Sequence, residues 1–115
     1  MELEKVALEV AATKAGLAVV KGAIVQGRSG VDHRFAVVVS DGVHSFAFDF
    51  YEGARDVDVL STYVKKYDTG LETNIVSSGK NTPLAATLAQ EYGMKLVTPE
   101  SVGSFFDVML VQART

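Results

Sequence analysis

The strongest constraint on the fold is a hairpin pattern in the middle of the chain. Residues 34–40 (RFAVVVS) and 43–51 (VHSFAFDFY) are rich in β-branched and aromatic residues, and the dipeptide Asp41-Gly42 separates them. Asp and Gly both tolerate the positive φ angles of a type I′ turn, which joins antiparallel strands through two residues. The pattern therefore predicts two antiparallel strands joined by a tight turn.

The second of these strands places its phenylalanines on one face. Successive side chains of a strand point to opposite sides, so the three phenylalanines share a face with His44. The other face carries Ser45, Ala47, Asp49 and Tyr51. We expect the phenylalanines to face a core. For Asp49 we favour a salt-bridged or partly solvated carboxylate over a group held at a functional site.

Helices and strands alternate along the rest of the chain. The predicted elements are a helix over residues 1–15, strands over 17–26, 34–40 and 43–51, a helix over 58–70, a strand over 73–77, a helix over 82–93, a strand over 94–97 and a helix over 102–113. A hairpin followed by helix–strand units is typical of a mixed sheet covered by helices. We therefore predict an α/β fold of order α-β-β-β-α-β-α-β-α, with a mixed sheet of about five strands, in a single domain over residues 1–115.

Residues that begin and end helices support these boundaries. Asp58 is a candidate N-cap, and Thr82-Pro83 combines an N-cap with proline at the first helical position. Gly16 and Gly70 follow the first two helices as stop signals. The predicted apolar stripe of the first helix consists of Leu3, Val6, Ala7 and Val10.

Composition excludes several classes of function. The chain has no cysteine, which rules out a disulfide, a thiolate nucleophile and a cysteine zinc site. Its formal net charge of −3 argues against a general nucleic-acid coat protein but is compatible with a local basic patch. No apolar run approaches the roughly 20 residues that span a bilayer, and the acidic N-terminus lacks a secretory pattern. We therefore expect a cytoplasmic protein without a membrane segment.

Three segments, together with the order of elements, resemble a known family. They are residues 27–35 (GRSGVDHRF) before the hairpin, residues 68–70 (DTG) and residues 88–97 (LAQEYGMKLV). Over most of residues 1–100 the chain is similar to small archaeal-type proteins of the restriction-endonuclease-like superfamily, close to Mrr-type nuclease domains. The resemblance implies the core fold of that superfamily, and it does not extend to the helix over residues 102–113.

Nucleases of that superfamily use a metal site, and the resemblance implies where its parts would stand here. One hairpin strand begins with an acid, the next carries acid-spacer-lysine, and a glutamate on the first helix assists. Carboxylate oxygens hold Mg²⁺, the metal polarises the phosphate and activates water, and the lysine steadies developing charge. The matching second-strand acid is Asp49, and the helix glutamate is Glu9, or alternatively Glu4 or Glu2.

Two positions depart from that pattern. Ala36 stands where the hairpin acid is expected, and the nearest acid is Asp32 in the preceding loop. Phe50 is the spacer after Asp49, and Tyr51 then occupies the lysine position. A shift of register by one residue would turn Asp49 toward the phenylalanine face. The resemblance therefore implies the frame of a nuclease site whose central residues are missing.

These departures lead to the function that we predict. The chain is a non-catalytic nuclease-like domain that binds nucleic acid (DNA or RNA) or another protein, needs no cofactor and forms a homodimer. The candidate nucleic-acid or phosphate contacts are Arg28, Ser29 and Arg34.

Two alternatives stay open. One is a Mg²⁺-dependent phosphodiesterase with a migrated site on Glu9, Asp32 and Asp49, in which Asp32 and Asp49 bind the metal and Arg28 or Arg34 replaces the lysine. The other is a small-ligand or regulatory domain that uses the loop over residues 27–30.

Overall fold

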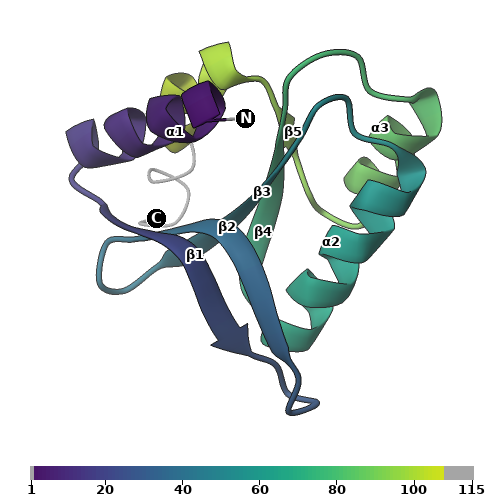
Figure 1. Ribbon diagram of the computed structural model, residues 1–115, viewed down its shortest axis with the longest axis horizontal. Helices are drawn as coiled ribbons and strands as arrows, with labels where there is room; N and C mark the ends of the chain where they lie inside the picture. The colour runs from purple at the N-terminus through teal and green to yellow at the C-terminus, as the bar shows by residue number, and fades with distance from the viewer. Residues whose placement is uncertain (1, 108–115) are drawn as a thin grey trace.

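The computed structural model of the chain describes residues 2–107, which form a five-stranded mixed sheet with helices on both faces (Figure 1). In chain order the elements are α1 (Glu2–Lys14), β1 (Ala18–Gln26), β2 (Asp32–Ser40), β3 (Ser45–Tyr51), α2 (Asp56–Thr69), β4 (Glu72–Ser77), α3 (Pro83–Glu91), β5 (Leu96–Val97) and the 3₁₀ turn η1 (Pro99–Ser101). The strand order is β1-β2-β3-β4-β5, with the first two pairings antiparallel and the last two parallel. The predicted α/β class, element order and five-stranded mixed sheet are confirmed.

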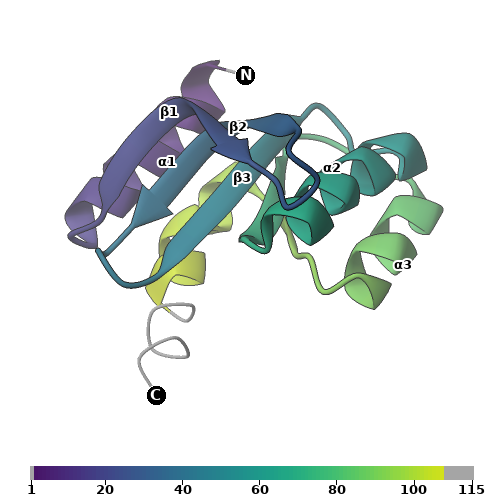
Figure 2. The ribbon, with the colours of Figure 1, turned by 90° about the horizontal axis from the view of Figure 1, so that it is seen from below.

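The helices divide between the two faces of the sheet. The α2 and α3 helices cover one face, and α1 together with the helical residues 102–107 covers the other, as two views at right angles show (Figure 1, Figure 2). Of the helix predicted over residues 102–113, the part over 108–113 lies outside the described residues. Within residues 2–107, no helix has the length and apolar character needed to cross a membrane.

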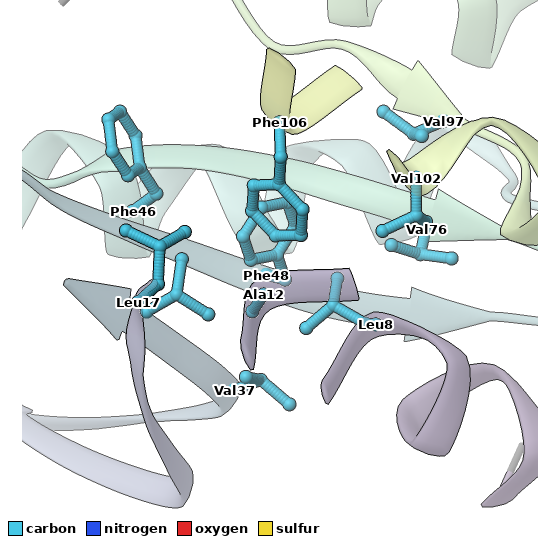
Figure 3. Packing of buried hydrophobic residues seen from close by; sticks show 11 residues of the cluster. Leu8, Ala12, Leu17, Val37, Phe46, Phe48, Val76, Val97, Val102 and Phe106 are labelled. Carbon is cyan, nitrogen blue, oxygen red and sulfur yellow. The ribbon is translucent and has the colours of Figure 1, made fainter. Parts of the chain in front are cut away.

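Each face of the sheet has its own hydrophobic cluster. On the α1 side, Phe46 and Phe48 of β3 pack with Leu8 and Phe106 (Figure 3). On the other side, the buried cluster beneath α2 and α3 consists of Ala54, Val59, Ile75, Ala85, Ala89 and Met94. The predicted orientation of the phenylalanines toward a core is confirmed.

The α1 helix packs on the sheet through small residues, and the stripe predicted for it is wrong. Leu8 and Ala12 are fully buried, whereas Val6 and Val10 of the predicted stripe are 51% and 47% exposed. The residues beside Leu8 on the buried side are mostly alanines, which let a helix approach a sheet closely. The stripe was predicted mainly from the large apolar side chains, and these lie largely on the exposed side of the helix.

The turn between β2 and β3 is longer than predicted. The two strands pair as far as Ser40 and Ser45, which leaves residues 41–44 in the turn. Gly42 has a φ of 94° but Asp41 does not have a positive φ, so a type I′ turn does not form. The Asp41 carboxylate instead accepts the N–H groups of His44 (2.6 Å) and Val43 (2.9 Å). These hydrogen bonds stabilise the wider turn and hold the pKa of Asp41 well below its usual range.

Two of the predicted helix boundaries are confirmed and one is shifted. The α2 helix ends before Gly70, which has a φ of 74°, and α3 begins after Thr82, whose hydroxyl accepts a backbone N–H of the first turn. The start of α2 was predicted too late, because Asp58 lies inside its first turn rather than at its N-cap. From there the Asp58 carboxylate accepts the N–H of Arg55 (2.9 Å), so the helix begins at Asp56.

The β1–β2 pair extends beyond β3 as a two-stranded ribbon. β2 pairs with β3 from Val37 to Ser40, while residues 32–35 continue to pair with β1. Two-stranded ribbons twist more strongly than wide sheets, and the tip of this one lies beside α2 (Figure 2). Gly22, which lies across from Ala36 and has a φ of 61°, marks the step at which β2 leaves β3. The candidate functional residues lie around this step.

Candidate functional site

A cleft of about 490 Å³ lies between α1 and the β1–β2 ribbon, and we call it the basic cleft. Lys5 and Glu9 of α1, Lys21 of β1, and Arg34 and Ala36 of β2 line it. Its described lining residues carry three cations against one carboxylate, a net charge of +2. In a chain whose net charge is −3, this is a local concentration of positive charge.

The cations of the basic cleft lie near its surface. The Lys21 Nζ is 3.5 Å from Glu9 Oε2, in a pair whose side chains are 63% and 40% exposed. Such exposed pairs contribute little to stability and exchange readily with solvent ions. The Arg34 guanidinium extends across Gly22, where an added Cβ would lie 3.4 Å from its Nη1. The cleft can therefore accept an anion from solvent.

On the α2 side of the sheet, the buried Asp49 forms an ion pair with Lys65, whose side chain is largely buried. Asp49 is only 6% exposed, and Lys65 Nζ lies 2.5 Å from its Oδ2. The Thr62 hydroxyl donates to the same oxygen (3.0 Å), and the Ala36 N–H donates to Oδ1 (3.4 Å). The interpretation of Asp49 as a salt-bridged carboxylate is confirmed, and its cation comes from α2.

Tyr51 extends this buried network. Its hydroxyl lies 3.0 Å from the Thr62 hydroxyl. Burial raises the pKa of Tyr51, so the phenol stays protonated around neutral pH. The network thus contains one carboxylate and one ammonium, which balance each other, and two hydroxyls that add hydrogen bonds between α2 and β3. This composition suits structural support of the neighbouring strands.

The three acids of the migrated-site alternative lie apart from one another. Glu9 faces the basic cleft, whereas Asp49 lies on the opposite face of the sheet against α2. Asp32 is exposed at the far end of the ribbon, where it pairs with Gln26. It lies four residues from Ala36, which is about 13 Å along the strand. Within the described part of the chain, no group of three His, Cys, Asp or Glu side chains gathers at metal-binding range.

The loop over residues 27–30 is held to the end of α2 by a cluster of Ser29, His33 and Asp68, which we call the Asp68 cluster. The Asp68 carboxylate accepts the Ser29 N–H (3.0 Å) and hydroxyl (2.7 Å), and it lies 2.7 Å from His33 Nε2. Gly27 lets this carboxylate approach closely, because an added Cβ would collide with it unless the Asp68 side chain moved. The Arg28 guanidinium packs over Gly70. Of the three predicted phosphate contacts, only Arg34 lines the basic cleft, and the Ser29 hydroxyl already bonds to Asp68.

Acid is expected to loosen the Asp68 cluster between about pH 4 and pH 2. Hydrogen bonds, first from the Ser29 side chain and then from His33, lower the pKa of Asp68 from 3.8 to about 2. Because the folded-state pKa lies below the unfolded value, the stabilisation is fully present above about pH 4 and is lost as the pH falls through about 2.

Melting temperatures of the wild type and Asp68→Asn, measured in steps from pH 5 to pH 2, test this expectation. The wild type should melt higher at pH 5, and the difference should shrink toward pH 2. A difference that stays constant over this range would contradict the role of the ionised carboxylate.

Sequence reasoning missed Lys65 and Asp68 as site residues. Thr62 and Lys65 follow the buried Val59 at intervals of three along α2, which was a signal that polar residues lie on the inner side of this helix. Asp68 continues the same interval of three, but its partner could not be predicted, because Ser29 is 39 residues away in the chain. The carboxylate that meets Ser29 and His33 is thus Asp68 and not the acid next to them in the sequence, Asp32.

These features define a class of protein: a small α/β domain with a five-stranded mixed sheet, a basic cleft on one face and a buried ion pair on the other. No protein-family model and no curated protein match the chain. A crystal structure of a protein of unknown function, AF1548, is similar with a TM-score of 0.69 and 20% sequence identity, over 84% of this chain and 58% of that one. This likeness shows the fold, and the chain spans 58% of the length of that protein.

Proposed function

We propose that the chain is a non-catalytic, restriction-endonuclease-like domain that binds the phosphates of a nucleic acid in its basic cleft. The observation that carries this proposal is the convergence of Lys5, Lys21 and Arg34, from three different elements, on one cleft of an acidic chain. Lysine and arginine supply most of the affinity for phosphate backbones. The mixed sheet, with its antiparallel hairpin followed by parallel strands, is compatible with the superfamily that the sequence resembles.

The placement of the acids supports binding over cleavage. A Mg²⁺ site needs several oxygen ligands within about 2.1 Å of one point. Glu9 and Asp49 lie on opposite faces of the sheet, and Asp49 is already compensated by Lys65. Cleavage of labelled DNA by the wild type in Mg²⁺ or Mn²⁺, abolished by Asp49→Asn, would overturn the non-catalytic part of the proposal and favour the phosphodiesterase.

Fluorescence anisotropy with labelled duplex and single-stranded DNA at several salt concentrations tests the binding. Each phosphate contact contributes about −0.9 to the slope of log K against log salt for duplex DNA. Three contacts predict a slope of about −2.7, and Arg34→Gln should make it less steep by about 0.9. The matched control is Arg55→Gln, since Arg55 is exposed at the start of α2, outside the cleft. An affinity that depends neither on the salt concentration nor on any of the three cleft cations would contradict the proposal.

We also propose that the protein is cytoplasmic and that its protein partner is a second copy of the chain. Four exposed apolar side chains of α2 recur at intervals of three and four residues: Val57, Leu60, Val64 and Tyr67. This spacing forms one stripe along the helix, which two antiparallel copies can present to each other. Sedimentation velocity on the free protein distinguishes a monomer of 12.3 kDa from a dimer.

A further inference from the structure

The basic cleft and the buried Asp49–Lys65 pair lie on opposite faces of the sheet but meet at one short segment of β2. Lys65 Nζ donates to the backbone carbonyl of Arg34 (2.8 Å), and Asp49 Oδ1 accepts the backbone N–H of Ala36 (3.4 Å). One ion pair therefore holds both ends of the three-residue segment from which the Arg34 side chain extends. This segment is also the step at which β2 leaves β3.

The residue between these two contacts is fixed by the same lysine. The Phe35 side chain is fully buried, and Lys65 Nζ lies 4.9 Å from the centroid of its ring. All three residues of the segment line the basic cleft, and the Phe35 ring also contacts Lys65 of α2. With Phe35 held by this contact, the position from which the Arg34 side chain extends into the cleft is fixed as well.

We propose that the Asp49–Lys65 pair is a positioning device that sets the direction of Arg34 in the basic cleft. The inference rests on the proposed binding function and assigns a role in it to two residues that do not touch the ligand. A buried ion pair is weak evidence for stability alone, because apolar residues of similar size are often at least as stable. A role in holding residues 34–36 explains why an ion pair lies between β3 and α2.

The test replaces both charges at once, so that no buried charge is left uncompensated. In Asp49→Leu/Lys65→Met, anisotropy with labelled duplex DNA should show a salt slope less steep by about 0.9, as in Arg34→Gln. For affinities that are equal at 1 M salt, this slope difference gives a roughly eightfold weaker affinity at 0.1 M salt. Adding Arg34→Gln to the double variant should weaken binding no further, because both changes remove the same contact.

A matched control separates positioning from a general loosening of α2. Val59→Ala removes a buried side chain from the same helix without touching the ion pair. This variant should be less stable than the wild type but keep its salt slope. A double variant with the wild-type slope, or a Val59→Ala variant with the same loss of slope, would overturn the inference.

A second measurement needs no nucleic acid. Hydrogen exchange of the Ala36 amide should be faster in the double variant, and the Arg34 Nε–Hε resonance should shift, whereas Val59→Ala should leave both unchanged. If wild-type binding is insensitive to salt, the proposed function fails. In that case the positioning role is judged from the double variant alone. Ala36 exchange and an Arg34 resonance that match the wild type overturn it as well, and changes in both support it.

Discussion

Lys65→Met is expected to lower the free energy of unfolding by about 3–5 kcal/mol. The substitution keeps most of the lysine stem but removes the ammonium that lies 2.5 Å from Asp49 Oδ2. It leaves a carboxylate with 6% exposure and no cation. Because a buried charge without compensation is strongly destabilising, the loss should be close to that of removing a large core side chain. Urea denaturation followed by circular dichroism measures it.

The double variant Asp49→Leu/Lys65→Met separates charge from packing in the same experiment. It contains neither charge and should regain most of the stability lost in the single variant, since Thr62 can still bond to Tyr51. Lys66→Met, at the next residue of α2, is the matched control and should change stability by no more than about 0.5 kcal/mol. A Lys65→Met variant as stable as the wild type would contradict the buried pair.

Phe48→Ala is expected to lower the free energy of unfolding by about 3–5 kcal/mol. Phe48 is fully buried at the centre of the cluster beneath α1 (Figure 3). Its ring meets those of Phe105 and Phe106 nearly edge to face, at centroid distances of 5.9 and 5.7 Å. The substitution removes this ring and leaves a cavity that the fixed strands around it cannot close.

Phe50→Ala is the matched control for Phe48→Ala. Phe50 lies two residues along the same face of β3 but is only partly buried at the rim of the cluster. Its loss should therefore cost about half as much, since less apolar surface returns to water. Equal effects of the two substitutions would show that Phe48 is not the centre of this cluster.

The fold was predictable because its main signals are local. The alternation in β3, the glycine that ends α2 and the Thr82-Pro83 start of α3 each depend on residues close together in the chain. The predicted type I′ turn was wrong because Asp41-Gly42 can form more than one kind of turn. The Asp41 side chain satisfies two backbone N–H groups in a wider turn, and the sequence pattern does not contain that energy difference.

The candidate site was less predictable because its contacts are made across long separations in the chain. The apolar surroundings of Asp49 indicated that it needs a cation, but the sequence does not show which lysine or arginine supplies it. Lys65 fulfils this need because α2 crosses over β3 on the face to which Asp49 points. The convergence of Lys5, Lys21 and Arg34 likewise arises only when α1 and the ribbon pack together.

The position of Gly22 in β1 has a consequence for the solubility of the protein. β1 is the outermost strand of the sheet, and its nine residues include Val20 and Ile24, which are 55% and 59% exposed. An open, apolar strand of this kind is a template for aggregation with a strand of another chain. Between the two lie a charged residue, Lys21, and Gly22 with a φ of 61°, which interrupts the regular pleat. The backbone feature that gives Arg34 its room in the cleft thus also guards the exposed edge of the sheet against unwanted pairing.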